Sequence, residues 1–254
     1  MSGFVRNSMV NARLIIDRGS GPMNMAVDEA LLLSAPRTGP TLRFYQWEQP
    51  TLSLGYFQSA DERWRHEASS GCTLVRRSTG GGAILHDLEL TYSFVMPVSQ
   101  QDKSAAQPLY YAFHETLVQA LADLNIEATL VLRQPLQQIG QGEPFLCFQR
   151  QSVGDVLTAG SKICGSAQRR QKEALLQHGS VLLRRSSFAP ELPGIADLAA
   201  TSVSAEELAE IWLPRLERRL DFHFQACSLN VVEHSTAKRL AEDRFGADSW
   251  SLRR

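Results

Sequence analysis

The sequence has 254 residues, of which 43% are hydrophobic and 21% are charged, and its formal net charge at pH 7 is -1. This composition is that of a globular protein with one large or two small domains. The near-zero charge gives no indication of binding to nucleic acid or to a membrane surface. No segment reaches the ~18 to 20 apolar residues that span a bilayer, and the N-terminus lacks a signal-peptide core, so we expect a cytoplasmic protein.

The first half of the chain predicts an amphipathic helix followed by short strands. Helix formers and acidic residues predict a helix from Asn24 to a stop at Pro36. Two β-prone runs, 42–47 and 51–57, are separated by E-Q-P and are typical of a hairpin. We expect a short polar helix over 61–69, and strands over 73–78 and 90–97, the latter ending at Pro97.

The second half predicts two longer helices and further strands. Apolar residues recur at helical spacing over 108–124, with Asn125 as the terminator, and again over 204–220, with a kink possible at Pro214. We expect strands over 127–133 and 181–184, a loop over 134–144, and a strand, a turn and a strand from 145 to 165. The C-terminal thirty residues stay largely unassigned.

This order of elements indicates an α+β fold. Strands separated by turns favour a mixed, largely antiparallel sheet flanked by helices over a doubly wound parallel sheet, with the helices grouped on one side. No internal repeat, low-complexity tract or linker divides the sequence. We therefore expect a single domain over 1–254.

Three consecutive glycines follow the strand at 73–78, in the run R-R-S-T-G-G-G-A-I-L-H-D from 76 to 87. Backbone amides of Gly80, Gly81 and Gly82 are able to converge on a phosphate, an acyl carbonyl or an oxyanion. Arg76 and Arg77 alternate across the strand, so one of them would face the ligand. The run is neither a Walker loop nor a dinucleotide motif, and a tight structural turn is the alternative.

His86 and Asp87 close this run and suggest a base and its orienting carboxylate. Adjacent residues in a strand point to opposite faces, however, which favours a structural histidine for His86 considered alone.

Four cysteines, at 72, 147, 164 and 227, show neither a C-x-x-C pair nor zinc-ligand spacing, so we expect no metal. Cys147 follows the loop at 134–144, where a substrate has access, and is either a reactive thiol or an inert one. Cys164 shares a face with Lys162 but lies among glycines that indicate a buried, tightly packed turn. Cys72 and Cys227 are expected to be inert.

Lys162 stands among small residues in G-S-K-I-C-G, with little apolar surface for its stem. Since a thiol attacks as its thiolate, a nearby ammonium would favour the reactive form of Cys147, whereas a solvated surface lysine is the alternative. His178 lies in a polar group, Gln177 to Gly179, before the strand at 181–184, and a structural role is favoured over acid–base work.

Several runs together resemble the lipoate-protein ligase A and octanoyltransferase family. They are N-M-A-V-D-E-A-L-L, L-R-F-Y-Q-W-E-Q-P-T-L-S-L-G-Y-F-Q, R-R-S-T-G-G-G-A-I-L-H-D-L-E-L-T-Y-S and G-S-K-I-C-G-S-A-Q-R-R-Q-K-E-A-L-L-Q-H-G-S, in order over about 24–183. The resemblance implies the biotin/lipoate protein ligase catalytic fold. It also implies transfer of a lipoyl or octanoyl group to a lysine of a small acceptor domain.

The resemblance offers two mechanisms. Ligases activate lipoate with ATP and Mg through an acyl-adenylate, whereas transferases take octanoate from acyl carrier protein through a cysteine thioester and need no cofactor. Cys147 stands where cysteine-dependent octanoyltransferases and the related amidotransferases have their nucleophile. Lys162 matches the lysine that is assigned to keeping that cysteine ionised and polarising the acyl carbonyl.

We also expect no separate C-terminal accessory domain of the kind that many ligases have, which favours the octanoyltransferase, although in some ligases that domain is a separate protein. The third glycine, Gly82, is a departure, because octanoyltransferases often have arginine there and ligases often have glycine. An ATP-dependent ligase and an amidotransferase that moves the acyl group between lipoyl domains therefore remain the alternatives.

The resemblance implies partners and further site residues. The donor would be acyl carrier protein, and the acceptor a lipoyl domain or a glycine-cleavage H-type protein. Catalysis falls to Cys147 and Lys162, and the substrate-binding residues would be Arg76, Arg77, Gly80, Gly81, Gly82, Ala83, His86, Gly165, Ser166 and Ala167.

Overall fold

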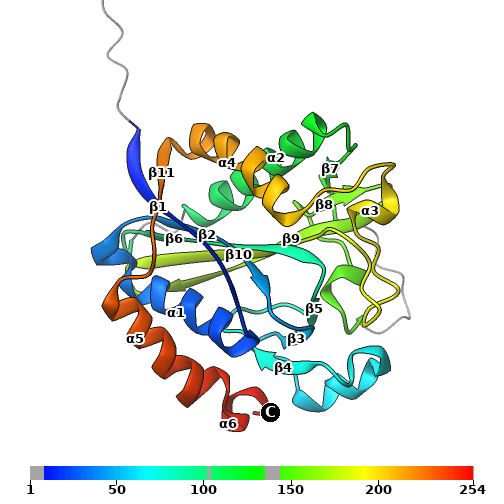
Figure 1. Ribbon diagram of the computed structural model, residues 1–254, viewed down its shortest axis with the longest axis horizontal. Helices are drawn as coiled ribbons and strands as arrows, with labels where there is room; N and C mark the ends of the chain where they lie inside the picture. Colours follow the sequence, from blue (N-terminus) through cyan, green and yellow to red (C-terminus); the bar gives the residue numbers. More distant parts are fainter. Residues whose placement is uncertain (1–8, 102–103, 135–143, 254) are drawn as a thin grey trace, which may run out of the picture.

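The computed structural model describes residues 9–101, 104–134 and 144–253, and a mixed sheet forms its centre (Figure 1). The strand order is β11-β1-β2-β6-β10-β9-β8-β7. β1 runs parallel to β2 and β11, and the other neighbouring pairs are antiparallel, as predicted. The strands are β1 (Val10–Gly19), β2 (Thr41–Trp47), β6 (Glu89–Pro97), β7 (Thr129–Leu130), β8 (Val156–Thr158), β9 (Ser161–Gln171), β10 (Ala174–Leu182) and β11 (Phe222–Ala226).

A smaller sheet has the order β4-β3-β5 and carries the glycine run. β3 (Thr51–Leu54) lies parallel to β4 (Thr73–Arg76) and antiparallel to β5 (Ile84–His86). The predicted hairpin of 42–47 with 51–57 is therefore wrong. Both edges of β2 are already paired, with β1 and β6, so the next strand has to join another sheet.

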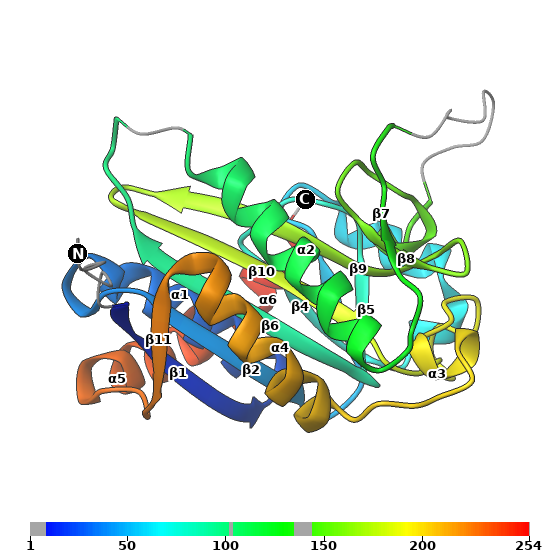
Figure 2. The same ribbon diagram turned by 90° about the horizontal axis from the view of Figure 1, so that it is seen from above.

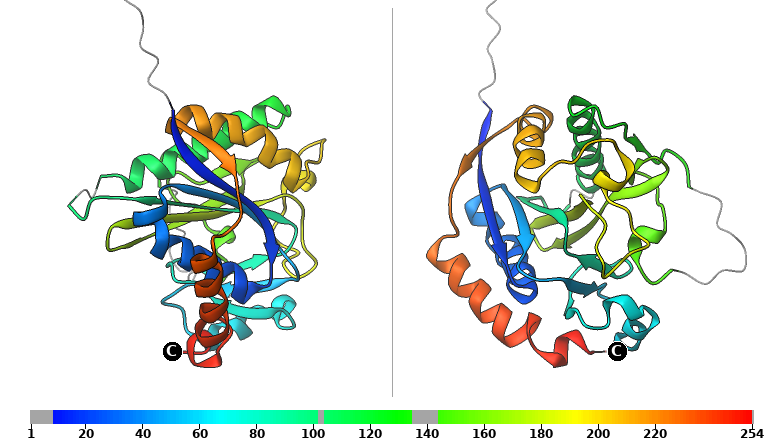
Figure 3. Two further views of the ribbon diagram at one scale, coloured as in Figure 1. Left: turned by 60° about the vertical axis from the view of Figure 1, so that its left-hand side comes forward. Right: turned by 45° about the vertical axis from the view of Figure 1, so that its right-hand side comes forward.

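Helices cover both faces of the large sheet (Figures 2 and 3). α2 and α4 cross one face, and α1 and α5 lie side by side on the other. The helices are α1 (Gly21–Thr38), α2 (Ala106–Asp123), α3 (Ile195–Leu198), α4 (Ala205–Leu220), α5 (Val231–Leu240) and α6 (Asp248–Ser251), with a π turn at Ala241–Phe245 and 3₁₀ turns at Ala60–Arg65, Glu67–Ser69 and Cys147–Gln149. Grouping of the helices on one side was thus a wrong prediction.

Two apolar layers explain why both faces need a cover. Phe113 and Leu117 of α2 and Trp212 of α4 pack against Phe44 and Tyr92 of the sheet. On the other face, α1 and the C-terminal segment enclose a second layer, which includes Leu31, Tyr45 and Phe245. The sequence pattern missed this arrangement because part of the cover of the second face comes from C-terminal residues that had no assignment.

The helix predictions are confirmed at their centres. α2 and α4 match the predicted ranges closely, and Asn125 follows α2 at φ 56, a left-handed conformation that asparagine tolerates. α1 begins earlier and ends later than predicted, because Pro22 fits its first turn and Pro36 lies in its last turn. A proline so close to the C-terminal end of the helix removes few of its backbone hydrogen bonds, so α1 continues past Pro36.

The strand predictions are less accurate after residue 126. The strand at 127–133 shortens to two residues, and the loop at 134–144 lies mostly outside the described residues. The segment after Phe145 is a 3₁₀ turn rather than a strand. The strand expected at 181–184 begins at Ala174, so Gln177 to Gly179 lie inside β10 instead of before it.

In the described part of the chain, no helix is both long and apolar enough to cross a bilayer.

A buried ion cluster joins α1 to the large sheet beside the smaller sheet. The guanidinium of Arg43 lies 3.0 Å from Oδ1 of Asp28 and 2.8 Å from Oδ1 of Asp17, and it is 1% exposed. Tyr45 and Ser93 also donate to Asp28, at 3.0 and 2.7 Å. Burial alone would raise the pKa of Asp28, but the bond from His178 and the charge of Arg43 outweigh it and lower that pKa.

Replacing Arg43 by methionine should lower the free energy of unfolding by about 3 to 5 kcal/mol, because Asp28 would remain buried without its cation. Urea unfolding measures the change. Arg185→Met is the matched control, since the Arg185–Asp197 pair is exposed and 3.7 Å long, and its loss should stay below about 1 kcal/mol. Equal losses in the two variants would contradict this account of Arg43.

Candidate active site

A backbone bridge joins the glycine run of the smaller sheet to the turn that carries Cys147. The amide of Cys147 donates to the carbonyl of Ala83 at 2.7 Å, and the amide of Ala83 donates to Phe145 at 3.1 Å. Cys147 is the first residue of its 3₁₀ turn and is partly exposed. The bridge therefore holds the thiol beside the glycines, although more than sixty residues separate them in the sequence.

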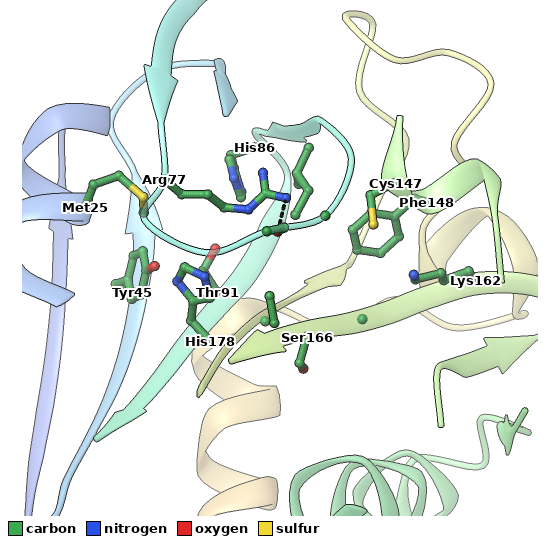
Figure 4. Close-up of a pocket in the computed structure, with 16 residues that line it drawn as sticks. Met25, Tyr45, Arg77, His86, Thr91, Cys147, Phe148, Lys162, Ser166 and His178 are labelled. Atoms are coloured by element: carbon green, nitrogen blue, oxygen red, sulfur yellow. Dashed lines mark hydrogen bonds between the residues drawn. The ribbon is translucent and has the colours of Figure 1, made fainter. Parts of the chain in front are cut away.

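A cavity of about 70 Å³ opens between the two sheets and brings most of the predicted site residues together (Figure 4). Of the predicted residues, Arg76, Gly82 and Ala83 are not part of its lining. In the view shown, Cys147, Phe148 and Lys162 lie at one side of it and Met25 and Tyr45 at the other. The lining consists of Met25, Tyr45, Arg77, Gly80, Gly81, Ile84, His86, Thr91, Cys147, Phe148, Lys162, Gly165, Ser166, Ala167, His178 and Gly179.

Lys162 is a buried cation with a carboxylate partner. Its Nζ lies 2.8 Å from Oδ2 of Asp155, and both side chains are nearly inaccessible, at 4% and 2% exposed. The amide of Ser152 and the hydroxyl of Tyr110 donate to the same carboxylate, at 2.7 and 3.2 Å. The surface-lysine alternative is thus wrong.

The backbone around Lys162 differs from the prediction. Lys162 lies in β9, paired with Leu157 of β8, and not in a turn. The turn comes just before it, where Ala159 and Gly160 have positive φ. Because the β8–β9 connection is this short, Asp155 and Lys162 face each other across the hairpin.

Arg77 holds the glycine loop by hydrogen bonds to its backbone. Its Nη2 donates to the carbonyls of Gly80 and Gly82, at 2.9 and 2.7 Å. Gly81 has φ +98, which disfavours any other residue. Gly55 is equally necessary, since a Cβ there would lie 1.9 Å from the carbonyl oxygen of Gly81.

The amides of Gly80 and Gly81, which line the cavity, are available to a ligand, whereas Gly82 is buried and is not part of the lining. Arg77 bonds two carbonyls of the loop. The amides of Gly80, Gly81 and Gly82 donate to no acceptor among the residues described. Free amides beside a nucleophile are suitable donors to a developing oxyanion. This geometry fits the predicted role of the loop.

Of the two arginines, only Arg77 lines the cavity, as their alternation predicted. Arg76 points away and donates to carbonyls of Gly55, Gln58, Ser251 and Arg253. It ties the C-terminal segment to the smaller sheet. The substrate-binding role expected for Arg76 has no support in this arrangement.

His86 lines the cavity, but its orienting carboxylate is Glu89 and not Asp87. Nδ1 lies 2.6 Å from Oε1 of Glu89, Nε2 lies 2.8 Å from Oγ of Ser53, and the ring stacks on Trp47. Asp87 instead accepts a bond from Ser186. With both nitrogens bonded and one face covered, the imidazole presents mainly its other face to the cavity.

His178 is held in the same way. Nε2 lies 2.7 Å from the hydroxyl of Thr79 in the glycine run, and Nδ1 lies 3.2 Å from Asp28. The structural role that the sequence favoured for His178 fits these contacts. Because the polar atoms of His86 and His178 are bonded to protein, their surfaces in the cavity suit an apolar chain.

Gly165, Ser166 and Ala167 of β9 form one wall of the cavity, as predicted. Oγ of Ser166 lies 2.6 Å from Nε2 of His114, whose Nδ1 is 2.5 Å from the carbonyl of Gly154. Nδ1 must therefore carry the proton, so Ser166 donates to His114 and accepts from Tyr92, 2.6 Å away. The Ser166 hydroxyl has no proton left to donate to a substrate.

The other cysteines are poor nucleophiles by position. Burial raises the pKa of Cys164, which is fully enclosed and has its sulfur 3.9 Å from Nε2 of His114. Cys72 is buried too, and Cys227 is exposed beside Arg13, away from the cavity lining. Among the described residues, no cluster of three His, Cys, Asp or Glu side chains forms a metal site.

The sequence analysis missed several residues of this site. The cavity lining also includes four residues from segments whose sequence gave no functional signal, namely Met25, Tyr45, Thr91 and Phe148. Asp155 had a usable signal, because a lone carboxylate in the apolar run V-G-D-V-L suggests a buried partner.

A family model described as the lipoyl protein ligase A/B catalytic domain matches residues 20–190. The chain belongs to this family. Curated relatives include the octanoyltransferase LipM of Kyrpidia tusciae, 35% identical over 93% of this chain and 96% of that protein. The octanoyltransferase LipM of Bacillus subtilis is 31% identical over 94% of this chain and 97% of its own.

Solved structures share the fold. A bipartite lipoate protein ligase from Thermoplasma acidophilum has a TM-score of 0.75 at 24% identity, covering 96% of this chain and 98% of that one. LipL1 of P. falciparum, solved in complex with lipoate, has a TM-score of 0.69 at 15% identity over 96% of this chain and 74% of its own. The predicted ligase catalytic fold is thereby confirmed.

Gly165→Ala should reduce acyl transfer at least tenfold, because the new Cβ would lie 2.5 Å from Cε and 2.8 Å from Nζ of Lys162 and displace the ammonium. The rate of acylation of an acceptor domain measures this effect. Gly71→Ala is the matched control, since a Cβ there has open space and should leave the rate unchanged. Equal rates for both variants would argue against a role for the Lys162 position.

The stability of the protein should fall as pH is lowered from about 6.5 to 4. Burial lowers the pKa of His114 to about 4 from 6.5, so in this range the unfolded chain takes up a proton that the folded protein refuses. The contribution amounts to about 3 kcal/mol. Urea unfolding at several pH values should show a shallower fall for His114→Gln than for the exposed control His234→Gln. Identical slopes would contradict the assignment.

Proposed function

We propose that the protein is an octanoyltransferase of lipoate assembly that works through a thioester on Cys147. The observation that carries the proposal is that Cys147 and Lys162 share one cavity with the free amides of Gly80 and Gly81. The LipM relatives, aligned over more than nine-tenths of both chains, support octanoyl transfer over ATP-dependent ligation. The ligase structures are below 25% identity and bear on the fold alone.

In the first step, the Cys147 thiolate attacks the carbonyl carbon of an octanoyl thioester carried by acyl carrier protein. A carbon–sulfur bond forms to Cys147, and the bond to the carrier's thiol breaks, so that the thiol leaves as a thiolate and takes up a proton. Amides of Gly80 and Gly81 donate to the oxyanion, an interaction worth about 3 to 4 kcal/mol per donor. The Lys162 ammonium donates to the same oxygen, since Asp155 occupies only part of its donor capacity.

In the second step, the neutral amine of an acceptor lysine attacks the Cys147 thioester. A carbon–nitrogen bond forms, the amine loses a proton, and the Cys147 thiolate is regenerated. The acceptor is a lipoyl domain or a glycine-cleavage H-type protein. We place this reaction in the cytoplasm, in one catalytic domain and without a cofactor.

The apolar cavity accounts for the acyl chain. Met25, Ile84 and Ala167 supply apolar surface, and the histidines and Tyr45 have their polar atoms bonded within the protein. A hydrocarbon chain that enters from Cys147 therefore meets no unpaired polar side chain of these residues.

Incubation with octanoyl carrier protein should add one octanoyl group to the protein, and hydroxylamine should remove it. Cys147→Ala should form no adduct and should lose acceptor acylation by more than a thousandfold, because the nucleophile is gone. An adduct on Cys147→Ser would be an ester that resists the same treatment. Intact-protein mass spectrometry measures all of these species.

Cys227→Ala is the matched control and should behave like the parent protein, since Cys227 is exposed and outside the cavity lining. Full transfer activity in Cys147→Ala would overturn the proposal. Acylation of the acceptor from octanoate plus ATP, unaffected by Cys147→Ala, would replace it with the ligase reaction.

A further inference from the structure

The cations around Cys147 differ in how much of their charge is compensated. Lys162 forms a nearly inaccessible ion pair with Asp155 at 2.8 Å, so the pair carries no net charge. In a low-dielectric setting such a pair acts on a third group as a dipole, whose effect falls off faster with distance than that of a charge. The pair therefore brings no net positive charge to the neighbourhood of Cys147.

Arg77 is a buried cation whose bonds are all to neutral groups. It is 3% exposed, and its nitrogens donate to carbonyls of Ser53, Gly80 and Gly82 and to the hydroxyl of Ser53. Its Nε is buried and has no acceptor in the part of the chain that the structure describes. In the described residues, no carboxylate pairs with this guanidinium, although an unpaired buried charge is costly.

The loop connects Arg77 directly to the Cys147 backbone. Gly82 accepts from Arg77 at 2.7 Å, and a Cβ on Gly82 would lie 3.4 Å from Cα of Cys147. The next residue, Ala83, accepts from the Cys147 amide. Figure 4 shows the Arg77 side chain extending across the cavity toward the side where Cys147 lies.

We propose that Arg77 is a positioning residue that supplies the net positive charge for the Cys147 thiolate, while the Lys162–Asp155 pair serves the acyl carbonyl. The thiolate is then the counter-ion that the buried guanidinium otherwise lacks. This inference rests on the proposed function, because it assigns the charge that the nucleophile of that reaction requires.

Two electrostatic observations agree with it. Burial lowers the pKa of Arg77 to about 10, so the group remains a cation at neutral pH, and the charge of Cys147 is the neighbour that acts in the opposite direction. Arg150 also lies near, with Nη2 3.3 Å from an ideal Cβ on Gly82. Arg150 is only half-buried, so water and salt screen its charge more strongly.

The test is the pH dependence of Cys147 alkylation by iodoacetamide, in a Cys227→Ala background, followed by peptide mass spectrometry. Arg77→Gln should move the midpoint of the alkylation rate upward by about one pH unit or more. Arg77→Lys keeps the charge and should restore most of the shift, although it cannot bridge two loop carbonyls. Arg185→Gln, at an exposed ion pair, should leave the midpoint unchanged.

A second variant tests the other half of the assignment. Lys162→Met combined with Asp155→Asn removes the pair without changing net charge and should leave the midpoint within a few tenths of a pH unit. An upward shift in this double variant of the size expected for Arg77→Gln would overturn the proposal. An unchanged midpoint in a folded Arg77→Gln protein would overturn it too. If Arg77→Gln fails to fold, the double variant and Arg77→Lys still decide.

Alkylation requires no acyl donor or acceptor, so this outcome is independent of the proposed reaction. One outcome would overturn the proposed function and leave the charge assignment of Arg77 intact. It is the expected upward shift of the alkylation midpoint in Arg77→Gln, combined with full octanoyl transfer by Cys147→Ala. A thioester on Cys147 with no shift of the alkylation midpoint in Arg77→Gln would support the proposed function and overturn the charge assignment of Arg77.

Discussion

The bridge between Ala83 and Leu146 is the contact on which the active site depends. It joins a loop of the smaller sheet to the turn of Cys147 through two backbone hydrogen bonds, of 2.7 and 3.1 Å. Backbone bonds of this kind fix position without requiring a particular side chain. Cys147 and the glycine loop consequently keep one geometry beside the cavity that lies between the sheets.

Buried charge is the second constraint on this region. Arg43, Lys162 and Arg77 are all almost inaccessible, and each needs acceptors in place of water. Arg43 has carboxylates from β1 and α1, and Lys162 has one from the residue before β8, whereas Arg77 has only carbonyls and a hydroxyl among the described residues. This difference agrees with the different roles proposed for the three cations: Arg43 in the fold, Lys162 at the acyl carbonyl and Arg77 at the Cys147 thiolate.

The sheet topology explains why the site has an apolar interior with polar walls. Gly165, Ser166 and Ala167 of β9 and His178 and Gly179 of β10 line the cavity, and Ser166 reaches His114 and Tyr92 through the hydrogen bonds that consume its proton. Polar side chains therefore stabilise the walls by bonding to one another. A hydrocarbon chain in the cavity competes with none of these bonds.

The sequence by itself determined the α+β class, the cores of the helices at 106–123 and 205–220 and the position of the glycine loop, because periodicity and residue chemistry are local properties. The choice of Cys147 and Lys162 as catalytic residues came from the family resemblance and stays a prediction. The sequence failed where pairing is decided by distant partners. β3 left the main sheet because β2 had no free edge, and helices covered both faces because the C-terminal segment folds back onto α1. Likewise, only the tertiary structure decided that Asp155 neutralises Lys162, that Glu89 orients His86 and that Arg77 is the arginine that faces the cavity, since charge compensation depends on through-space distance.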